Sequence, residues 1–183
     1  QGRVEEIALQ SDGRIVASGR IWNGLDWDFG VWRLNSDGTP DTSFGGTGVR
    51  QFEFGTGNSE AYGLAVQADG RIVVGGFSNN GTDTDFTLAR LNSDATLDTS
   101  FGVGGVVQTP IGAGRDESYS LALQPDGKIV AVGWTDTGPV NDFDYALVRY
   151  NQDGSLDTGF GNGGKVVTSI GGEWAVYDIA STI

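Results

Sequence analysis

Residues Leu91–Phe101 read LNSDATLDTSF, and this stretch occurs three times with small changes. Residues 34–44 read LNSDGTPDTSF, and residues 150–160 read YNQDGSLDTGF. Upstream of each copy lies an Asp-Gly motif whose aspartates, Asp12 and Asp69, are 57 residues apart, and the third, Asp126, follows after another 57. A fixed period of this length indicates an array of one repeated supersecondary unit.

Each unit contains four short apolar runs that alternate with polar or small residues, as strands do. In chain order they are residues 1–10, 15–21, 29–34 and 49–54, then 62–67, 72–77, 86–91 and 106–111, then 119–124, 129–134, 145–150 and 165–170. The Asp-Gly pair between the first two runs predicts a hairpin with a two-residue primed turn. A partial copy of the first run at 177–182 raises the predicted number of strands to thirteen, and no segment has sustained helical periodicity.

This pattern predicts an all-β fold, a β-propeller made of four-stranded antiparallel blades, because four strands per unit of 40–60 residues are typical of a propeller blade. We divide the chain into a partial repeat at 1–33, complete repeats at 34–90 and 91–149, and a partial repeat at 150–183. Three blades do not close a ring and leave sheet edges exposed. We therefore expect either a homodimer that completes a six-bladed ring or a fragment of a longer array.

The pattern LALQPDGKIV…D[FY]xLxR[LY]NxDGxLDTSFGxGG resembles the delta-60 repeat family, and its first half is similar to the NHL repeat. Ala95, Gly159 and Pro40 depart from it, standing where the pattern has glycine, serine and leucine. The resemblance implies a bacterial β-propeller domain of unknown function. It implies no catalytic residue.

Composition excludes several classes of function. The chain has 11 basic and 24 acidic residues, a net charge of −13, which repels nucleic-acid phosphate and anionic lipid. No apolar run of about 18 residues is present, so we expect no membrane insertion. Because His and Cys are both absent, the chain contains no Ser-His-Asp or Cys-His system and no His/Cys zinc site. We expect a protein that is not an enzyme.

Paired aspartates before the third strand of each unit are the strongest chemical signal. In an extended chain, residues i and i+2 share a face about 6.6 Å apart. Such a pair can hold Ca²⁺ with backbone carbonyls and water, or can simply cap the hairpin. The same spacing suits a glycosidase, but a threefold repeat argues against a catalytic site. The candidate calcium ligands are Asp26, Asp28, Asp83, Asp85, Asp142 and Asp144, and we expect no other cofactor.

Two further features recur in each unit. Arg33, Arg90 and Arg149 lie on the third strand, where they form either an anion-binding ring or ion pairs with the aspartate of the DTSF segment. The phenylalanine of that segment is expected to fill the space between blades. Ala95 replaces a glycine of the sister copies, which predicts that this turn does not need a positive φ.

Because strands alternate in direction, the turns of a blade fall on two rims. The Asp-Gly turns and the DTSF segments share one rim, which we call the uniform rim. The loops after the second and fourth strands share the other, which we call the variable rim because their lengths and sequences differ. Its candidate binding residues are Trp22, Asn23, Trp27, Asn79, Asn80, Trp134, Asp136 and Trp174.

Tryptophan beside amides and carboxylates suits a protein or glycan surface, although some of these rings would instead fill gaps between blades. The leading functional hypothesis is a non-catalytic binding or scaffold module of a secreted or cell-surface bacterial protein. The alternative is a structural or adhesive spacer rigidified by calcium. A carboxylate-based glycan-active enzyme is the third hypothesis.

Overall fold

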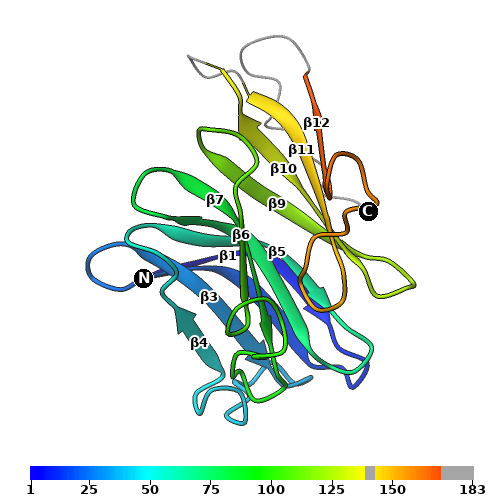
Figure 1. The fold of residues 1–183 in the computed structure, drawn as a ribbon. Coiled ribbons are helices and arrows are strands. Elements are labelled where there is room, and N and C mark those ends of the chain that lie inside the picture. The colour runs from blue at the N-terminus through cyan, green and yellow to red at the C-terminus, as the bar shows by residue number, and fades with distance from the viewer. Residues whose placement is uncertain (139–142, 170–183) are drawn as a thin grey trace.

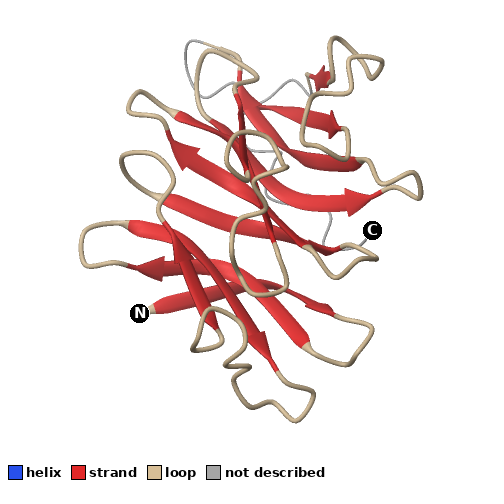
Figure 2. Cartoon of the chain, turned by 60° about the horizontal axis from the view of Figure 1, so that its bottom comes forward, coloured by secondary structure: helices blue, strands red, loops and turns tan. Residues whose placement is uncertain are grey.

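The computed structural model describes residues 1–138 and 143–169, which form twelve strands in three antiparallel sheets (Figures 1 and 2). Within this part of the chain there is no helix that could cross a membrane. The first sheet contains β1 (Gly2–Leu9), β2 (Ile15–Trp22), β3 (Trp27–Leu34) and β4 (Val49–Phe52). The second contains β5 (Ser59–Val66), β6 (Ile72–Asn79), β7 (Thr84–Leu91) and β8 (Val106–Thr109), and the third contains β9 (Asp116–Leu123), β10 (Ile129–Asp136), β11 (Phe143–Tyr150) and β12 (Lys165–Thr168).

Each sheet is a blade whose strands pair in chain order. The first strand of a blade packs against the preceding blade, because β5 contacts β1, β2 and β3, and β9 contacts β5, β6 and β7. The predicted all-β propeller architecture with four-stranded blades is therefore confirmed. The thirteenth strand, predicted at 177–182, lies outside the described residues.

The first strand of every blade carries a β-bulge at the same place in the repeat. The register shifts between Val4 and Glu6 in β1 and between Ala61 and Gly63 in β5, and β9 shifts in the same way against β10. A bulge leaves one residue unpaired and bends its strand. The extra residues are Glu5, Tyr62 and Tyr119, so the three blades share this irregularity as well as their strands.

The Asp-Gly hairpins form, but the predicted two-residue turn is wrong. Gln10 N donates to Arg14 O at 2.9 Å, and Gly13 N donates to Gln10 O at 2.9 Å. Gly13 has a φ of 85°, whereas Asp12 is not in the left-handed region. The loop is thus longer than two residues, and its glycine alone takes the positive φ that a type I turn followed by a bulge requires.

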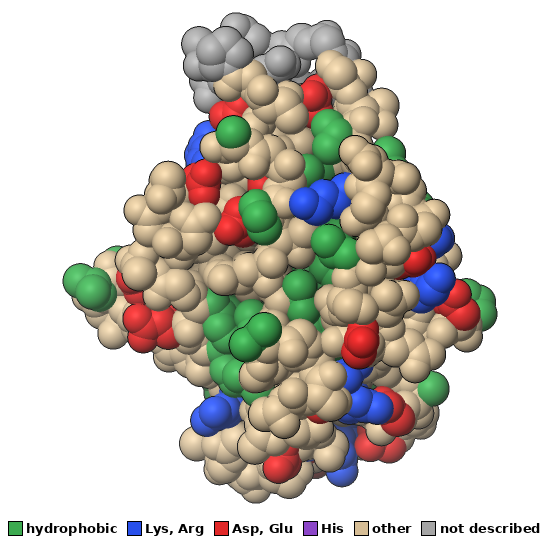
Figure 3. Space-filling view, viewed as in Figure 1, with side chains coloured by type: hydrophobic (Ala, Val, Ile, Leu, Met, Phe, Trp, Pro, Cys, Tyr) green, Lys and Arg blue, Asp and Glu red, His purple; other side chains and the backbone are tan. Residues whose placement is uncertain are grey.

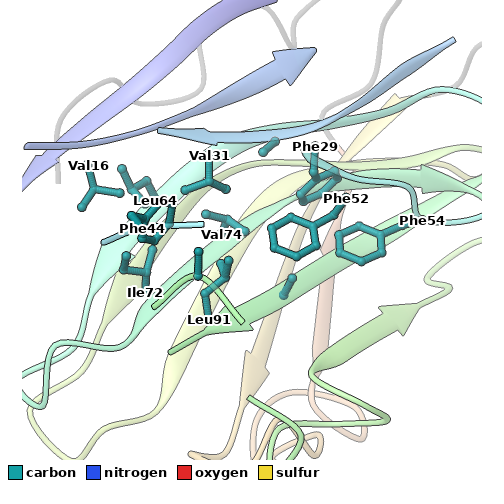
Figure 4. Close-up of a cluster of buried hydrophobic side chains, with 13 residues drawn as sticks. Val16, Phe29, Val31, Phe44, Phe52, Phe54, Leu64, Ile72, Val74 and Leu91 are labelled. Atoms are coloured by element: carbon teal, nitrogen blue, oxygen red, sulfur yellow. The ribbon is translucent and has the colours of Figure 1, made fainter. Parts of the chain in front are cut away.

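Two apolar clusters hold the blades together, one at each junction. The cluster between the first and second blades includes Phe29, Phe44 and Leu64 (Figure 4). The cluster between the second and third blades includes Phe101 and Leu121. Phe44 and Phe101 are fully buried, which confirms that the DTSF phenylalanine fills the space between blades.

Ala95 contradicts the sequence-based prediction for its turn. Its φ is 73°, close to the 84° of Gly38 at the equivalent place in the first blade. Ala95 N donates to Asn92 O at 3.0 Å, and Gly38 N donates to Asn35 O at 2.9 Å. The two turns therefore have the same backbone conformation. The methyl group of Ala95 is buried in the apolar cluster between the first and second blades, and this packing offsets the strain of the positive φ.

Candidate functional site

On the uniform rim, the recurring arginines form buried ion pairs. Arg33 Nε donates to Asp41 Oδ2 at 2.8 Å, and the Arg33 guanidinium carbon lies 4.6 Å from the centre of the Phe44 ring. Arg33 Nη1 donates at 2.7 Å to the carbonyl of Ser93, which belongs to the next blade. The arginine therefore joins its own DTSF segment to the neighbouring hairpin, and we call this set of contacts the arginine lock. Equivalent pairs join Arg90 to Asp98 and Arg149 to Asp157.

A second cation faces each aspartate of the lock. Arg71 Nη1 lies 2.7 Å from Asp98 Oδ2, and Lys128 Nζ lies 3.0 Å from Asp157 Oδ2. Burial alone would raise the pKa of Asp98, but hydrogen bonds from Ser100 and Arg71 outweigh it and hold that pKa well below its usual value. The ion-pair interpretation of the arginines is confirmed, and their positive charge is already neutralised at this rim.

The variable rim of the first blade presents an exposed aromatic surface. The Trp22 side chain is 40% exposed and meets Trp27 edge to face, with ring centres 5.2 Å apart. The Arg20 guanidinium lies 4.9 Å from the centre of the Trp27 ring and donates a hydrogen bond to Glu60 of the second blade. Leu25, at the tip of the loop, is exposed. We call Trp22, Leu25 and Trp27 the rim patch.

Asn23 organises this loop from within. Its Nδ2 donates to Asp26 Oδ1 and, at 3.0 Å, to Asp28 Oδ2. Its Oδ1 accepts hydrogen bonds from the backbone amides of Leu25, at 2.7 Å, and Asp26, at 3.0 Å. Both ends of the side-chain amide are used, so Asn23 holds the loop in shape and is not a free contact for a partner.

The second blade has the same arrangement, an asparagine amide that bridges the two aspartates of the pair. Asn80 Nδ2 donates to Asp83 Oδ1 at 2.7 Å and to Asp85 Oδ2 at 2.9 Å. Asn79 Oδ1 accepts a hydrogen bond from the Gly81 amide at 2.8 Å. Both asparagines are therefore engaged within their own loop, and no exposed tryptophan of the described residues stands beside them.

The aspartate pairs thus have an amide nitrogen between their carboxylates in the first two blades. Asp28 Oδ2 also accepts from Gln51 Nε2 at 2.7 Å, and Asp144 Oδ2 accepts from the Thr137 hydroxyl at 2.7 Å. Within residues 1–138 and 143–169, no three acidic side chains are grouped as a metal site requires. Asp142 lies outside the described residues.

The third blade places its tryptophan differently. Trp134 is only 8% exposed, and it meets Phe143 edge to face at 4.5 Å. The Arg115 guanidinium lies 5.6 Å from the centre of the Trp134 ring. Trp134 therefore fills space inside its blade. Asp136 pairs with Phe143 at the end of β10, and Trp174 lies outside the described residues.

Sequence analysis missed a row of tyrosines and glutamates on the first strands. Tyr62 and Tyr119 stack across the junction of the second and third blades, with ring centres 4.8 Å apart. Each donates its hydroxyl hydrogen bond to the glutamate two residues earlier, at 2.8 Å to Glu60 and 3.0 Å to Glu117. Burial raises the pKa of Glu117. The repeated Glu-x-Tyr spacing was the signal available in the sequence.

Charge is distributed evenly on the face seen in Figure 3. Acidic and basic side chains are interspersed there and form no large patch of one sign. A groove of about 700 Å³ lies at the outer edge between the second and third blades, lined by Val103, Val107 and Gly154 among others. It contains no grouping of charged side chains that would support catalysis.

Comparison with known proteins supports the fold. A family model described as "Domain of unknown function (DUF5122) beta-propeller" matches residues 10–44, 67–101 and 124–160. No curated protein sequence matches the chain. Among solved structures, hydrazine synthase from Kuenenia stuttgartiensis is similar over 94% of this chain and 26% of that chain, with 15% identity and a TM-score of 0.45. A similarity this weak carries no argument about fold or function, and the support for the fold comes from the family model. The narrower resemblance to delta-60 and NHL repeats stays a prediction.

Proposed function

The chain belongs to the DUF5122 β-propeller family of unknown function, and we propose that it is a non-catalytic binding module whose partner contacts the rim patch. We assign it to a secreted or cell-surface bacterial protein. Its net charge of −13 and its lack of His and Cys support a soluble, acidic scaffold without nucleophilic or zinc chemistry.

The exposure of Trp22 is the observation that carries this proposal. An aromatic ring that is large, rigid and only partly covered is the kind of residue on which binding energy concentrates. Trp22 is fixed by its edge-to-face contact with Trp27, and Asn23 holds the loop between them. A surface that is already ordered loses little conformational entropy when a partner binds.

The rim patch favours a protein partner over a glycan. Leu25 extends the apolar surface beyond the tryptophans, and its aliphatic tip has no polar group to offer a sugar hydroxyl. A protein partner with its own apolar side chains would cover Leu25 and Trp22 together, and the nearby Asp26 carboxylate would favour a basic residue at the edge of that contact. Binding to a glycan is the competing possibility, and the same experiment tests both.

The proposal can be tested with a displayed peptide library and a glycan array, both probed with the intact chain. We expect peptides to be selected, and we expect Trp22→Ala/Leu25→Ala to weaken their binding at least about tenfold, the effect of a loss of about 1.4 kcal/mol. Val103→Ala is the matched control, because Val103 is an exposed apolar residue outside the variable rim. Selected ligands that bind wild type and the double variant equally would contradict the proposal.

Calcium-dependent rigidity is the alternative, and the contacts in the described loops do not favour it. A calcium ion between Asp26 and Asp28 would have to displace the Asn23 amide, because its Nδ2 donates to both carboxylates. A melting temperature that falls when a chelator is added would nevertheless support the spacer over the binding module.

A further inference from the structure

The chain contains three asparagines that are followed directly by glycine. They are Asn23, Asn80 and Asn162. In such a pair the backbone nitrogen of the glycine can attack the side-chain amide of the asparagine, because glycine has no Cβ to shield that nitrogen. The first two asparagines lie in the loops after β2 and β6, and the third lies in the turn that leads into β12. The structure places them in different surroundings.

Asn23 and Asn80 are held by their own loops. The Nδ2 of each donates to two aspartates, and its Oδ1 accepts hydrogen bonds from two backbone amides farther along the loop. The amide of Gly81 is engaged as well, because it donates to Asn79 Oδ1 at 2.8 Å. These hydrogen bonds would have to break before either side-chain amide could meet the nitrogen of the glycine that follows it.

Asn162 lacks these restraints. It is exposed, and its side chain makes no hydrogen bond to any residue that the structure describes. The amide of Gly163 likewise donates to no described residue, and a Cβ on Gly163 would meet no atom within 4 Å. The turn itself is ordered, since Asn162 N donates to Lys165 O at 2.8 Å. The two reacting groups are therefore adjacent, accessible and not held by their neighbours.

The repeat shows that a following blade leaves this turn open. Val103 occupies the position of Asn162 in the second blade, and its turn has the same hydrogen bonds, from Val103 N to Val106 O at 2.8 Å and from Val106 N to Val103 O at 3.3 Å. The third blade packs against the second, yet Val103 is 89% exposed. The exposure of Asn162 thus follows from its place within the blade and does not depend on what covers the rest of the third blade.

We propose that Asn162 is a site of spontaneous deamidation, with water as the co-reactant, and that it reacts in preference to Asn23 and Asn80. The Gly163 nitrogen bonds to Asn162 Cγ and gives up its proton, while the bond from Cγ to Nδ2 breaks and ammonia leaves with that proton. A cyclic imide remains. Water then adds to one of the two imide carbonyls, and the bond from that carbonyl carbon to the Gly163 nitrogen breaks. Opening at Cγ gives aspartate, and opening at the main-chain carbonyl gives isoaspartate.

Both products change the turn before β12. Each adds one negative charge there, and isoaspartate also lengthens the main chain by the Cβ atom. In isoaspartate the former main-chain carbonyl, which accepts from Lys165 N at 3.4 Å, becomes part of the side-chain carboxylate. The regular bridge between residues 162 and 165 is then lost at the start of an outer strand. The reaction needs no partner at the rim patch, so it is independent of the proposed binding function.

Peptide mapping of the aged protein tests the proposal. The intact chain is incubated at mildly alkaline pH and digested, and mass spectrometry then reads the exchange of amide for acid at each asparagine. We expect Asn162 to react at least about tenfold faster than Asn23 and Asn80, because hydrogen bonds that together contribute about 1.4 kcal/mol must break first at those two sites. Asn162→Gln is the matched control and should remove the acidic species that forms first. A rate at Asn162 equal to or below that at Asn23 overturns the proposal.

Unfolding separates the effect of structure from that of local sequence. In concentrated urea the hydrogen bonds around Asn23 and Asn80 are lost, so the three asparagines should react at similar rates, and Asn162 should lose its advantage. A preference for Asn162 that persists unchanged in urea would place its cause in the neighbouring residues of the chain and would overturn the role given to the loop contacts.

Discussion

The two rims use the same residue types for opposite purposes. On the uniform rim, Asp41 lies against the Arg33 guanidinium, and the pair is buried between blades. On the variable rim, Asp26 is bridged to Asp28 by an asparagine amide, and Trp22 beside it faces solvent. The Arg–Asp pair occurs in every blade and is buried at both junctions between blades, whereas the exposed tryptophan occurs in one blade of the described chain.

This difference shows what repetition means in such an array. A side chain that recurs at a fixed position meets the same neighbour at every junction, so its repetition reports packing between blades. A side chain that differs between blades does not have to fit the same neighbour at every junction. Binding residues are therefore expected among the differences, and stability among the repeats. Substitutions on the two rims should separate these two roles.

Phe101→Ala should have the largest effect on stability. Its ring is fully buried between the second and third blades, and removal of such a ring costs about 3–5 kcal/mol. The free energy of unfolding, measured by urea titration, should fall by this amount. Trp22→Ala on the variable rim is the contrasting variant and should change it by less than about 0.5 kcal/mol. Equal losses for the two would contradict the division between rims.

Arg90→Ala should have the next largest effect. The substitution removes the lock and leaves the Asp98 carboxylate partly buried beside Arg71 alone, and breaking a buried pair costs about 3 kcal/mol. Arg115→Ala is the matched control on the variable rim. The Arg115 guanidinium lies 5.6 Å from the centre of the Trp134 ring, so the loss of this cation–π contact should cost about 0.5–1 kcal/mol.

Urea titration at neutral pH measures the free energy of unfolding of Arg90→Ala and Arg115→Ala, and Arg90→Lys is added as a third variant. Arg90→Lys keeps the charge but loses the forked geometry that reaches Gln152, so it should recover only part of the stability. If Arg90→Ala were no more damaging than Arg115→Ala, the lock would contribute little and the junctions would depend on apolar packing alone.

Acid should weaken the uniform rim first. The hydrogen bond from the Ser43 hydroxyl lowers the pKa of Asp41, and Lys128 lowers that of Asp157. A carboxyl whose pKa is lower in the folded state stabilises the fold above its unfolded pKa of about 3.9, and this contribution is lost as the pH falls through the folded value. Stability should therefore decline below about pH 4.

Two variants make the pH measurement specific. Asp98→Asn removes one of these carboxylates, so its unfolding free energy should be lower at neutral pH and should fall less steeply in acid. Glu117→Gln should leave the acid decline in place, because burial raises the pKa of Glu117 and protonation relieves a penalty there. An acid decline that is equally steep in Asp98→Asn would place its origin elsewhere in the molecule.

Repetition made the fold and the lock predictable. The 57-residue period predicts the blades, and the recurrence of Arg33 beside an apolar neighbour predicts its pairing with Asp41, because a buried guanidinium needs a carboxylate. Exposure at the variable rim could not be predicted in this way. Trp22 and Trp134 both precede a variable loop, but Trp134 occupies the repeat position of Arg20, two residues before that of Trp22. Phe143 and Arg115 cover Trp134, whereas solvent meets Trp22.

Backbone conformation was harder to predict than side-chain pairing. The replacement of a glycine by Ala95 suggested a turn without a positive φ, but the turn kept its conformation and the alanine adopted a φ of 73°. Neighbouring contacts decide this. Asn92 accepts from the Ala95 amide, and the Ala95 methyl group is buried against the first cluster, so the surroundings hold a residue whose own preference is different.

Ala95→Gly should therefore have the smallest net effect of these substitutions. Glycine relieves the left-handed conformation, which costs an alanine about 1 kcal/mol, but it removes a buried methyl group that contributes about 0.8 kcal/mol. The two effects should nearly cancel in the free energy of unfolding. Gly38→Ala is the informative counterpart, because Gly38 has a φ of 84° and no atom within 4 Å of its added Cβ. It should lose about 1 kcal/mol to strain with no compensating packing, and an unfolding free energy equal to that of the wild type would contradict this account of the Ala95 turn.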